Sequence, residues 1–169
     1  QKAGIGWIGK HTNLITRDYG SWLFLGEILL DIELVYDTPF NDDLCGSCTA
    51  CLDACPTNAF PEPYILDASK CISYYTIEHR EEIPSDIEKN LSGWIFGCDI
   101  CQQVCPWNEK FAQFSTEEKL SPRSNLQNRH LSQWSTLTMD EFRLLFQNSA
   151  VKRTKFSGLT RNIQSANAL

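Results

Sequence analysis

The spacing of its cysteines constrains this chain more than any other feature of the sequence. One run, CGSCTACLDACP, has the pattern C-x2-C-x2-C-x3-C-P, and a second, CDICQQVCP, follows after a single intervening cysteine. Eight cysteines in 169 residues make up about 5 % of the chain, below the 8 to 10 % that marks a disulfide scaffold. The intervals between the cysteines are therefore more informative than their number. The positions are Cys45, Cys48, Cys51 and Cys55, then Cys71, then Cys98, Cys101 and Cys105.

Three thiols at intervals of three residues cannot pair satisfactorily with one another. They can converge on one iron–sulfur core from a tight loop whose backbone N–H groups hydrogen-bond the sulfur atoms. The fourth cysteine of such a run precedes a proline, where we expect a helix to start, and in two-cluster ferredoxins it ligates the other cluster. Crossed ligation of this kind uses all eight cysteines in two [4Fe–4S] clusters. The first cluster would take Cys45, Cys48, Cys51 and Cys105, and the second Cys55, Cys71, Cys98 and Cys101.

A disulfide framework and a pair of structural zinc sites are the alternatives. A zinc site with four cysteine ligands usually takes two C-x2-C pairs. Here the first run has a third cysteine at the same interval and a fourth followed by Pro56, a detail repeated at Pro106. The 26 residues between Cys71 and Cys98 depart from the simple ferredoxin pattern. Cys71 is therefore the ligand that the spacing supports least.

The segment before the cysteines is of a different kind. GIGWIGKHTNLI and YGSWLFLGEILLDIELVYD are rich in aromatic and branched residues and are punctuated by glycines, which predicts strands joined by turns. Thr38-Pro39 begins a linker into the cysteine region, where we expect loops and short helices. The expected fold class is α+β.

Helix signals follow in the second half of the chain. Pro84-Ser85-Asp86 indicates a helix start and Gly93 a stop, with Ile87 and Leu91 spaced for burial. We expect further helices over residues 115–120, over residues 139–146 with Thr138 as the N-cap, and from about Gly158 onward. The last of these places Leu159, Ile163, Ala166 and Leu169 on one side.

The charge is unevenly distributed. The chain has 15 basic and 21 acidic residues, yet from Arg143 to the end it has five basic residues and no acidic one. A nucleic acid would therefore approach this tail rather than the acidic cluster region, although VKRTKFSG by itself reads as an ordinary solvated surface. The longest apolar stretch, Trp22–Leu30, is interrupted by Gly26 and Glu27, so no membrane span is expected. No signal peptide is apparent, and we expect a cytoplasmic protein.

The glycine run GIGWIG matches G-x-G-x-x-G, but both nucleotide signatures that it suggests are incomplete. His11 stands where a P-loop needs Ser or Thr, and no acidic residue completes a dinucleotide fingerprint. A tight turn that brings the backbone close to a cofactor or to another strand explains the glycines equally well. His11, His79 and His130 are far apart in sequence, which favours surface or packing roles over metal binding.

Several phrases of the sequence together resemble the epoxyqueuosine reductase family along nearly the whole chain: GIGWIGKHTNLI, GSWLFLGEILLDIEL, CGSCTACLDACPTNAF, KCISYYTIEHR, GCDICQQVCPWN and VKRTKFSGLTRN. The resemblance implies a cobalamin-dependent reductase that converts epoxyqueuosine to queuosine at the tRNA wobble position, the last step of queuosine synthesis. It implies that electrons from an external donor pass through two [4Fe–4S] clusters to cobalamin. Its partners would be tRNA carrying epoxyqueuosine and the electron donor, and the protein would be a monomer.

The resemblance also implies an architecture. Residues 1–38 would end an α/β cobalamin-binding domain, residues 39–110 would form the two-cluster ferredoxin-like domain, and residues 111–169 would start a HEAT-like helical domain. The family's proton-donating Asp lies upstream of the AGIGWIGK phrase, so no catalytic residue is expected here and the chain alone is expected to be inactive. Carried over by position, Lys10, Ser73 and Asp99 would lie near cobalamin, and Lys152, Arg153 and Lys155 would contact tRNA.

Two other functions remain open at this stage. A corrinoid-dependent reductive dehalogenase would use the same cofactors on small organohalides, but KCISYYTIEHR and the basic, helical C-terminus disfavour it. A plain electron-transfer ferredoxin module would leave the first 38 residues and roughly the last 60 without a purpose.

Overall fold

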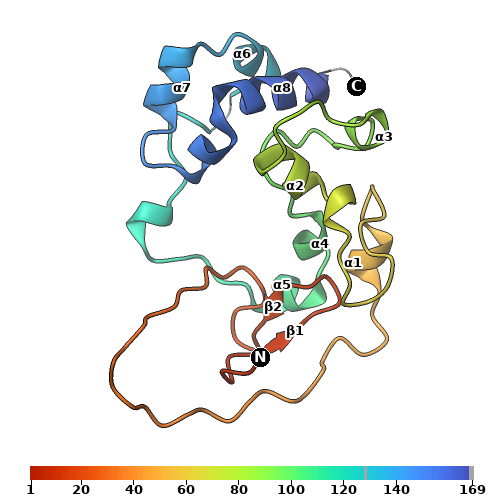
Figure 1. The fold of residues 1–169 in the computed structure, drawn as a ribbon, viewed down its shortest axis with the longest axis vertical. Coiled ribbons are helices and arrows are strands. Elements are labelled where there is room, and N and C mark those ends of the chain that lie inside the picture. The colour runs from red at the N-terminus through yellow and green to blue at the C-terminus, as the bar shows by residue number, and fades with distance from the viewer. Residues whose placement is uncertain (128, 168–169) are drawn as a thin grey trace. The chain divides into compact units, whose positions relative to one another are not determined.

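The computed structural model describes residues 1–127 and 129–167. The chain divides into two compact units (Figure 1): a first unit of residues 1–66 and 100–114, and a second unit of residues 67–99 with the described residues from 115 onward. Short helices dominate and the sheet is small, so the mixed character expected from the sequence is present in its coarse form.

A hairpin opens the first unit. Strands β1 (Trp7–Ile8) and β2 (Leu14–Ile15) pair antiparallel, with Trp7 opposite Ile15. A Cβ atom on Gly6 would lie only 2.0 Å from the Ile15 carbonyl oxygen. The glycine run therefore serves a close approach between two backbone segments, one of the two explanations that its sequence allowed.

An aromatic cluster forms the core of the first unit. Trp7 is 1 % exposed, contacts the edge of Trp107 at 4.8 Å between ring centroids, and stacks on Phe40. Ile15 and Cys105 complete this core, so one of the predicted cluster ligands is packed directly against the hairpin. The helices of this unit are α1 (Ala50–Asp53), α4 (Ile100–Gln103) and α5 (Pro106–Phe111).

Residues 22–45 contain neither helix nor strand, so the strands expected over YGSWLFLGEILLDIELVYD are absent. Apolar side chains of this segment are exposed, including Phe24 at 90 %, Leu29 at 95 % and Val35 at 99 %. A strand needs a neighbour to receive its backbone hydrogen bonds. Within residues 1–127 and 129–167 no such neighbour pairs with this segment, which explains why its apolar sequence does not form a sheet.

The second unit is helical. Its longest helix, α8, begins at Lys155, three residues before the expected start, and buries Leu159, Ile163 and Ala166 as predicted. Leu169, the fourth residue expected on that side, lies outside the described residues. The elements of this unit are η1 (Ala68–Lys70), α2 (Ile72–Ile77), α3 (Ser85–Glu88), η2 (Glu118–Leu120), α6 (Leu131–Ser135), α7 (Met139–Leu145), η3 (Ala150–Thr154) and α8 (Lys155–Asn167).

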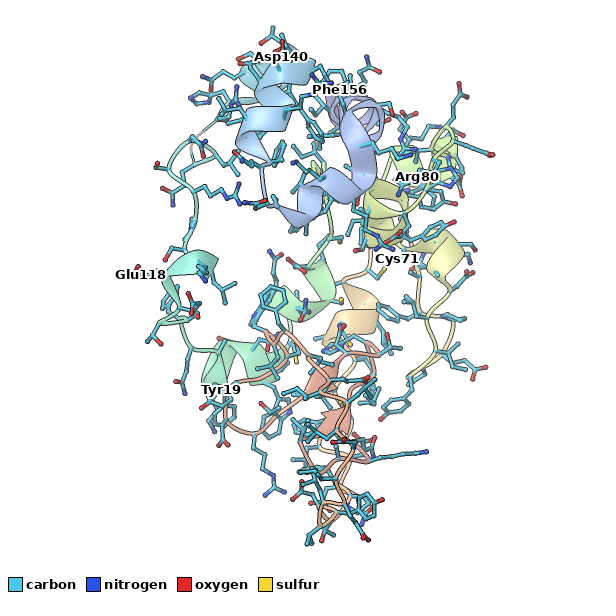
Figure 2. The ribbon with its side chains drawn as sticks, turned by 60° about the vertical axis from the view of Figure 1, so that its left-hand side comes forward. Tyr19, Cys71, Arg80, Glu118, Asp140 and Phe156 are labelled. Carbon is cyan, nitrogen blue, oxygen red and sulfur yellow. The ribbon has the colours of Figure 1, made fainter. Side chains whose placement is uncertain are left out.

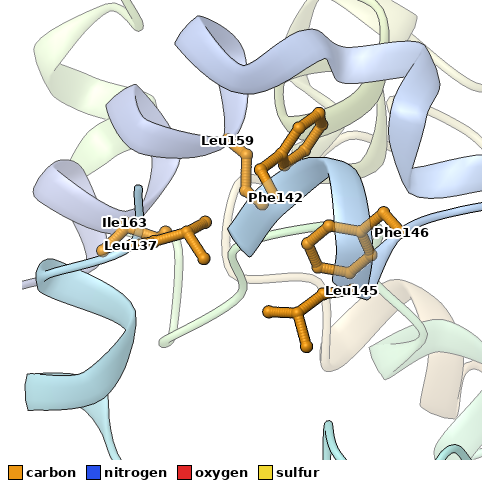
Figure 3. Close-up of a cluster of buried hydrophobic side chains, with 6 residues drawn as sticks. All are labelled: Leu137, Phe142, Leu145, Phe146, Leu159 and Ile163. Carbon is orange, nitrogen blue, oxygen red and sulfur yellow. The ribbon is translucent and has the colours of Figure 1, made fainter. Parts of the chain in front are cut away.

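Helices α7 and α8 share one of the two apolar clusters of this unit (Figure 3). The predicted cap of α7 is present, because the Thr138 hydroxyl accepts from the Glu141 N–H while the Glu141 carboxylate accepts from the Thr138 N–H. This capping box satisfies donors at the start of the helix. The capping box therefore fixes where α7 begins, and with it the position of the apolar side chains that pack against α8. The cluster consists of Leu137, Phe142, Leu145, Phe146, Leu159 and Ile163.

The other apolar cluster lies around α2 and α3. Helix α3 starts at the predicted position, after Pro84, and Ile87 and Leu91 are 4 % and 0 % exposed. Two consecutive residues of α8 hold this region. The Arg161 guanidinium donates to the carbonyl oxygens of Tyr75, His79 and Glu81, and the Asn162 amide donates to those of Thr76 and Ile95. Arg161, a residue of the basic tail, is therefore a support for the end of α2.

Three helix predictions were wrong. Helix α3 ends at Glu88, before the stop expected at Gly93. The helix expected over residues 115–120 is only the 3-10 turn η2, which spans three residues. The helix expected after Cys55-Pro56 does not form, since Asn58 adopts a positive φ of 48° that ends any helical path. The equivalent expectation at Cys105-Pro106 is confirmed, because Pro106 is the first residue of α5. No helix among the described residues has the length and apolar character needed to cross a membrane.

Candidate metal centre

Four cysteines of the first unit surround one cavity of about 240 Å³. Cys45 and Cys48 come from the loop before α1, Cys51 from α1 itself, and Cys105 from the residue preceding α5. Cys51 and Cys105 are buried, at 7 % and 6 % exposure. The structure thus brings together the four thiols that the spacing assigns to the first cluster, including Cys105 from the second cysteine run.

This cavity suits a polynuclear group better than a single ion. Its volume is several times the roughly 30 Å³ that one water molecule occupies. Nowhere in residues 1–127 and 129–167 do three His, Cys, Asp or Glu side chains lie close enough together to hold one metal ion. None of the eight cysteines forms a disulfide. Thiols spread around a cavity are the arrangement that an iron–sulfur core requires, because its four ligands bind from outside.

Burial controls the ionisation of these thiols. It raises the pKa of Cys51 to about 11, with a further contribution from the charge of Cys105. Burial also raises the pKa of Cys105, while the backbone N–H groups of Trp107 and Asn108 at the start of α5 oppose the rise. Thiols bind metal as thiolates. At neutral pH a cluster entering this cavity must therefore displace protons from Cys51 and Cys105.

Asn108 holds α5, and with it Cys105, against the loop that follows the hairpin. Its Oδ1 accepts from the Ser21 N–H at 2.6 Å, and its Nδ2 donates to the Ser21 Oγ at 2.9 Å and the Gln102 carbonyl at 2.8 Å. A Cβ atom on Gly20 would lie 2.1 Å from the Asn108 Oδ1. Glycine at position 20 therefore gives the Asn108 amide room to reach its partners.

A second set of contacts fixes the loop that carries Cys45 and Cys48. The Lys10 Nζ donates to the carbonyl oxygens of Gly46 at 2.6 Å and Cys48 at 2.9 Å. The Asp43 carboxylate accepts from the Cys45 N–H and from the Tyr64 hydroxyl. The hydrogen bond to Asp43 raises the pKa of Tyr64 to about 12. Together these contacts hold the loop open around the cavity.

The second ligand set is divided between the two units, so it stays a prediction. Cys55 and Cys101 belong to the first unit, and Cys71 and Cys98 to the second. The Cys55 Sγ accepts from the Ala59 N–H at 3.3 Å. Cys71 immediately precedes α2, as Figure 2 shows, and Cys98 packs against the apolar cluster of α2 and α3.

The remaining candidate residues have varied surroundings. Ser73 is half-buried within α2 and Asp99 is half-buried just before α4, whereas Lys10 is occupied by the two loop carbonyls. Lys152, Arg153 and Lys155 are exposed. They occupy η3 and the first residue of α8, and Arg153 pairs with Glu78 at 2.5 Å. None of these positions identifies a ligand by itself.

Sequence reasoning did not anticipate His11 in this site. The residue lines the cavity beside the four cysteines and is only 2 % exposed. Burial lowers its pKa. In the sequence, His11 is distinguished only by its position directly after Lys10 in the glycine loop. That position indicates a role in the site only when the structure shows that the loop borders the cysteines.

Comparison with known proteins gives this site a context. Residues 44–108 match the family described as a 4Fe-4S double cluster binding domain, which supports the iron–sulfur interpretation of the cysteine runs. The chain is 51 % identical over 162 residues to the epoxyqueuosine reductase of Cellulophaga algicola, an alignment that covers 96 % of this chain and 52 % of that protein. Most of this chain is thus similar to part of an epoxyqueuosine reductase.

Solved structures of epoxyqueuosine reductase show the same likeness. The structure from Bacillus subtilis matches 99 % of this chain and 44 % of that one, at 33 % identity and a TM-score of 0.90. A structure of an epoxyqueuosine reductase with an epoxyqueuosine-modified tRNA-Tyr stem loop matches with a TM-score of 0.91 at the same identity and coverage. The chain spans about half the length of the curated relatives it matches.

Proposed function

We propose that this chain is the iron–sulfur portion of an epoxyqueuosine reductase, which converts epoxyqueuosine to queuosine in tRNA as the last step of queuosine biosynthesis. The observation that carries the proposal is the similarity of 96 to 98 % of the chain to proteins of that name. We place the reaction in the cytoplasm, with an external electron donor and a monomeric protein.

Within this proposal the two cysteine sets hold two [4Fe–4S] clusters. Bound clusters would supply one-electron transfer toward the substrate. The cavity in the first unit supports the first set, since its four thiols share one space large enough for a polynuclear core. Trp7 and Trp107 pack beside Cys105 and exclude water from that side. The N–H groups at the start of α5 stabilise the Cys105 thiolate.

Cobalamin is the proposed second cofactor, and its assignment rests on the family resemblance alone. Lys10, Ser73 and Asp99 are its proposed neighbours. Titration of the purified protein with hydroxocobalamin tests them, because Ser73→Ala and Asp99→Ala should each weaken binding while Ser92→Ala, an exposed change in the same unit, should not. Equal binding by all these variants would remove Ser73 and Asp99 from the proposed site.

The proposed tRNA surface is formed by Lys152, Arg153 and Lys155. All three are exposed and lie within four residues of one another, which suits contact with a phosphate backbone. The double variant Lys152→Ala/Lys155→Ala should weaken tRNA binding and reduce the dependence of log K on log salt by about 1 to 2. Lys119→Ala, an exposed lysine on η2, is the matched control. An unchanged salt dependence would contradict the proposed surface.

A deletion of the complete gene tests the function. Nucleosides digested from the tRNA of the deletion strain should contain epoxyqueuosine in place of queuosine. The wild-type gene should restore queuosine, and a Cys45→Ser gene should not, because Cys45 is one of the proposed cluster ligands. Unchanged nucleosides in the deletion strain would reject the proposed function.

Iron and sulfide analysis tests the cofactor assignment separately. The anaerobically purified protein should contain about eight iron and eight sulfide per chain for two [4Fe–4S] clusters. Stoichiometric zinc without sulfide would overturn this assignment.

A further inference from the structure

One buried hydroxyl of the second unit is hydrogen-bonded to the chain beside two distant cysteines. The Thr76 side chain, on α2, is 0 % exposed. Its Oγ1 donates to the Ile72 carbonyl oxygen at 2.8 Å, a bond that threonine often makes within a helix, and accepts from the Gly97 N–H at 3.0 Å. Ile72 directly follows Cys71, and Gly97 directly precedes Cys98. A single side chain therefore connects the backbone at Cys71 with the backbone at Cys98 across the 26 residues that separate them.

The contact between Gly97 and Thr76 depends on a particular backbone conformation. Gly97 has a φ of 74°, a region that residues with a side chain rarely adopt. A Cβ atom on Gly97 would meet no atom within 4 Å, so lack of space does not account for glycine at this position. The backbone conformation accounts for it instead. This turn directs the Gly97 N–H to the Thr76 hydroxyl and leads the chain into Cys98.

A second buried side chain fastens the same two segments. Asn162, on α8, is 0 % exposed, and its Nδ2 donates to the carbonyl oxygens of Thr76 at 2.8 Å and Ile95 at 2.9 Å. Its Oδ1 accepts from the Arg161 guanidinium at 2.9 Å. A buried polar network whose members are satisfied holds the segments that it joins in one arrangement. The helical tail therefore supports the two segments that carry the cysteines.

The surroundings of Cys71 and Cys98 suit cluster ligands. Both side chains are half-buried, Cys71 directly before α2 and Cys98 against the apolar cluster of α2 and α3. A cluster needs thiols that converge on one core. The spacing supports Cys71 least, because of the long insertion that follows it. The Thr76 contacts act across space, so they fix the two backbone segments whatever the length of chain between them.

We propose that Thr76 is a positioning residue for the second iron–sulfur cluster, because its hydroxyl holds the backbone at Cys71 and at Cys98 in the arrangement in which both thiols bind one cluster. This inference rests on the proposed second ligand set and adds to it a residue that acts through the backbone. Without the hydroxyl, the Gly97 N–H loses its acceptor and the turn before Cys98 is released. The second cluster is then lost selectively. The first cluster is retained, since its ligands all belong to the other unit.

The first test removes the hydroxyl with little change in the shape of the side chain. Thr76→Val should contain about four iron and four sulfide per chain in place of about eight of each. Anaerobic redox titration followed by electron paramagnetic resonance should show one reduction step instead of two. Thr76→Ser, which keeps the hydroxyl, should retain both clusters. Thr154→Val is the matched control and should also retain both, because Thr154 is 1 % exposed in the same unit and its hydroxyl has no hydrogen-bond partner among the described residues.

The second test disturbs the same contact from the Gly97 side. Gly97→Ala removes no buried side chain, so it decides the question even if Thr76→Val fails to fold. Alanine is strained at a φ of 74°, so the turn should move its N–H away from Thr76, and one cluster should be lost. Gly93→Ala is the matched control, because Gly93 has a φ of 79° and its Cβ would also meet no atom within 4 Å. This control should retain both clusters.

The outcomes separate this inference from the proposed function. Unsubstituted protein without iron and sulfide overturns both clusters, and the inference with them. A Cys71→Ala variant with two reduction steps removes Cys71 from the ligand set and likewise overturns the inference. If Cys71→Ala loses one cluster, two retained clusters in either Thr76→Val or Gly97→Ala overturn the role of Thr76 alone. A Thr76→Val protein that loses iron but keeps two reduction steps does the same, because general destabilisation would deplete both clusters.

Discussion

The Asn108 side chain gives the sharpest test of how the cavity is built. Asn108 is 5 % exposed and joins α5 to Ser21 and Gln102 through three hydrogen bonds. Helix α5 starts directly after Cys105. Asn108→Ala removes all three bonds without touching a proposed cluster ligand. We expect this variant to be less stable and to hold less iron.

The size of the expected decrease in the free energy of unfolding follows from the groups that lose their hydrogen-bond partners. The buried Ser21 N–H loses its acceptor at 2.6 Å, a loss that costs about 1 to 3 kcal/mol. The two bonds donated by the Asn108 Nδ2 each contribute about 1 kcal/mol. Since neighbouring losses are not additive, the expected decrease in the free energy of unfolding is about 3 kcal/mol. That is a large share of the roughly 5 to 15 kcal/mol that stabilises a typical domain.

Two measurements on anaerobically purified protein check this expectation. Urea unfolding followed by circular dichroism gives the change in stability, and iron and sulfide analysis gives the cluster content. Asn108→Asp keeps an acceptor for the Ser21 N–H but replaces the donor to the Gln102 carbonyl oxygen with a buried carboxylate oxygen, so it should also be less stable than the unsubstituted protein. Glu109→Ala changes an exposed neighbour on α5 and should stay within about 0.5 kcal/mol of the unsubstituted protein. If Asn108→Ala were no less stable than Glu109→Ala, the argument from buried partners would be refuted.

Two further predictions concern a glycine and a helix cap. Gly6→Ala should disrupt the hairpin and lower the iron content, because its Cβ would lie 2.0 Å from the Ile15 carbonyl oxygen, whereas Gly26→Ala, which meets no atom within 4 Å, should change neither. Thr138→Ala should cost about 1 kcal/mol of stability in urea unfolding, the usual value of an N-cap, and a change below 0.3 kcal/mol would contradict the capping box. Hydrogen bonds from the Thr138 backbone and hydroxyl lower the pKa of Glu141 from its ordinary 4.5. The stabilisation from the Glu141 carboxylate is therefore complete above that value and is lost as the pH falls through the lowered pKa. A carboxyl titration by nuclear magnetic resonance should show this pKa rise toward 4.5 in Thr138→Ala.

The features predicted well from the sequence are those that depend on short intervals along the chain. Three cysteines at intervals of three residues must lie close together, and Cys45, Cys48 and Cys51 line one cavity from the loop before α1 and from α1 itself. The Thr138 cap and the burial of Leu159 and Ile163 are likewise set within a few residues, and the structure confirms both. The ligand role of Cys71 stays a prediction because 26 residues of intervening chain weaken any argument from spacing.

The features predicted poorly depend on partners that are distant in the chain. Residues 22–45 have the composition of strands, yet a strand exists only where another strand accepts its hydrogen bonds. The two Cys-Pro pairs show the same limit. Pro106 starts a helix that Asn108 fastens to Ser21, 87 residues away in sequence, whereas Pro56 is followed by a turn at Asn58. Identical dipeptides therefore adopt different structures.

His11 could not have been assigned from sequence for a more specific reason. Its place in this site depends on two conditions at once: burial beside the cysteines and an Nδ1 already engaged by Asn13. The hairpin creates both conditions, because β1 and β2 fold the glycine loop back while Lys10 fastens that loop to the cysteine run. A loop that resembled an incomplete phosphate-binding motif thus contributes a lysine that holds the cysteine loop and a histidine that is buried in the lining of the thiol cavity. Gly6 lets the loop backbone approach the Ile15 carbonyl oxygen, and Gly9 leaves room for the Ile15 side chain. These close contacts account for both glycines.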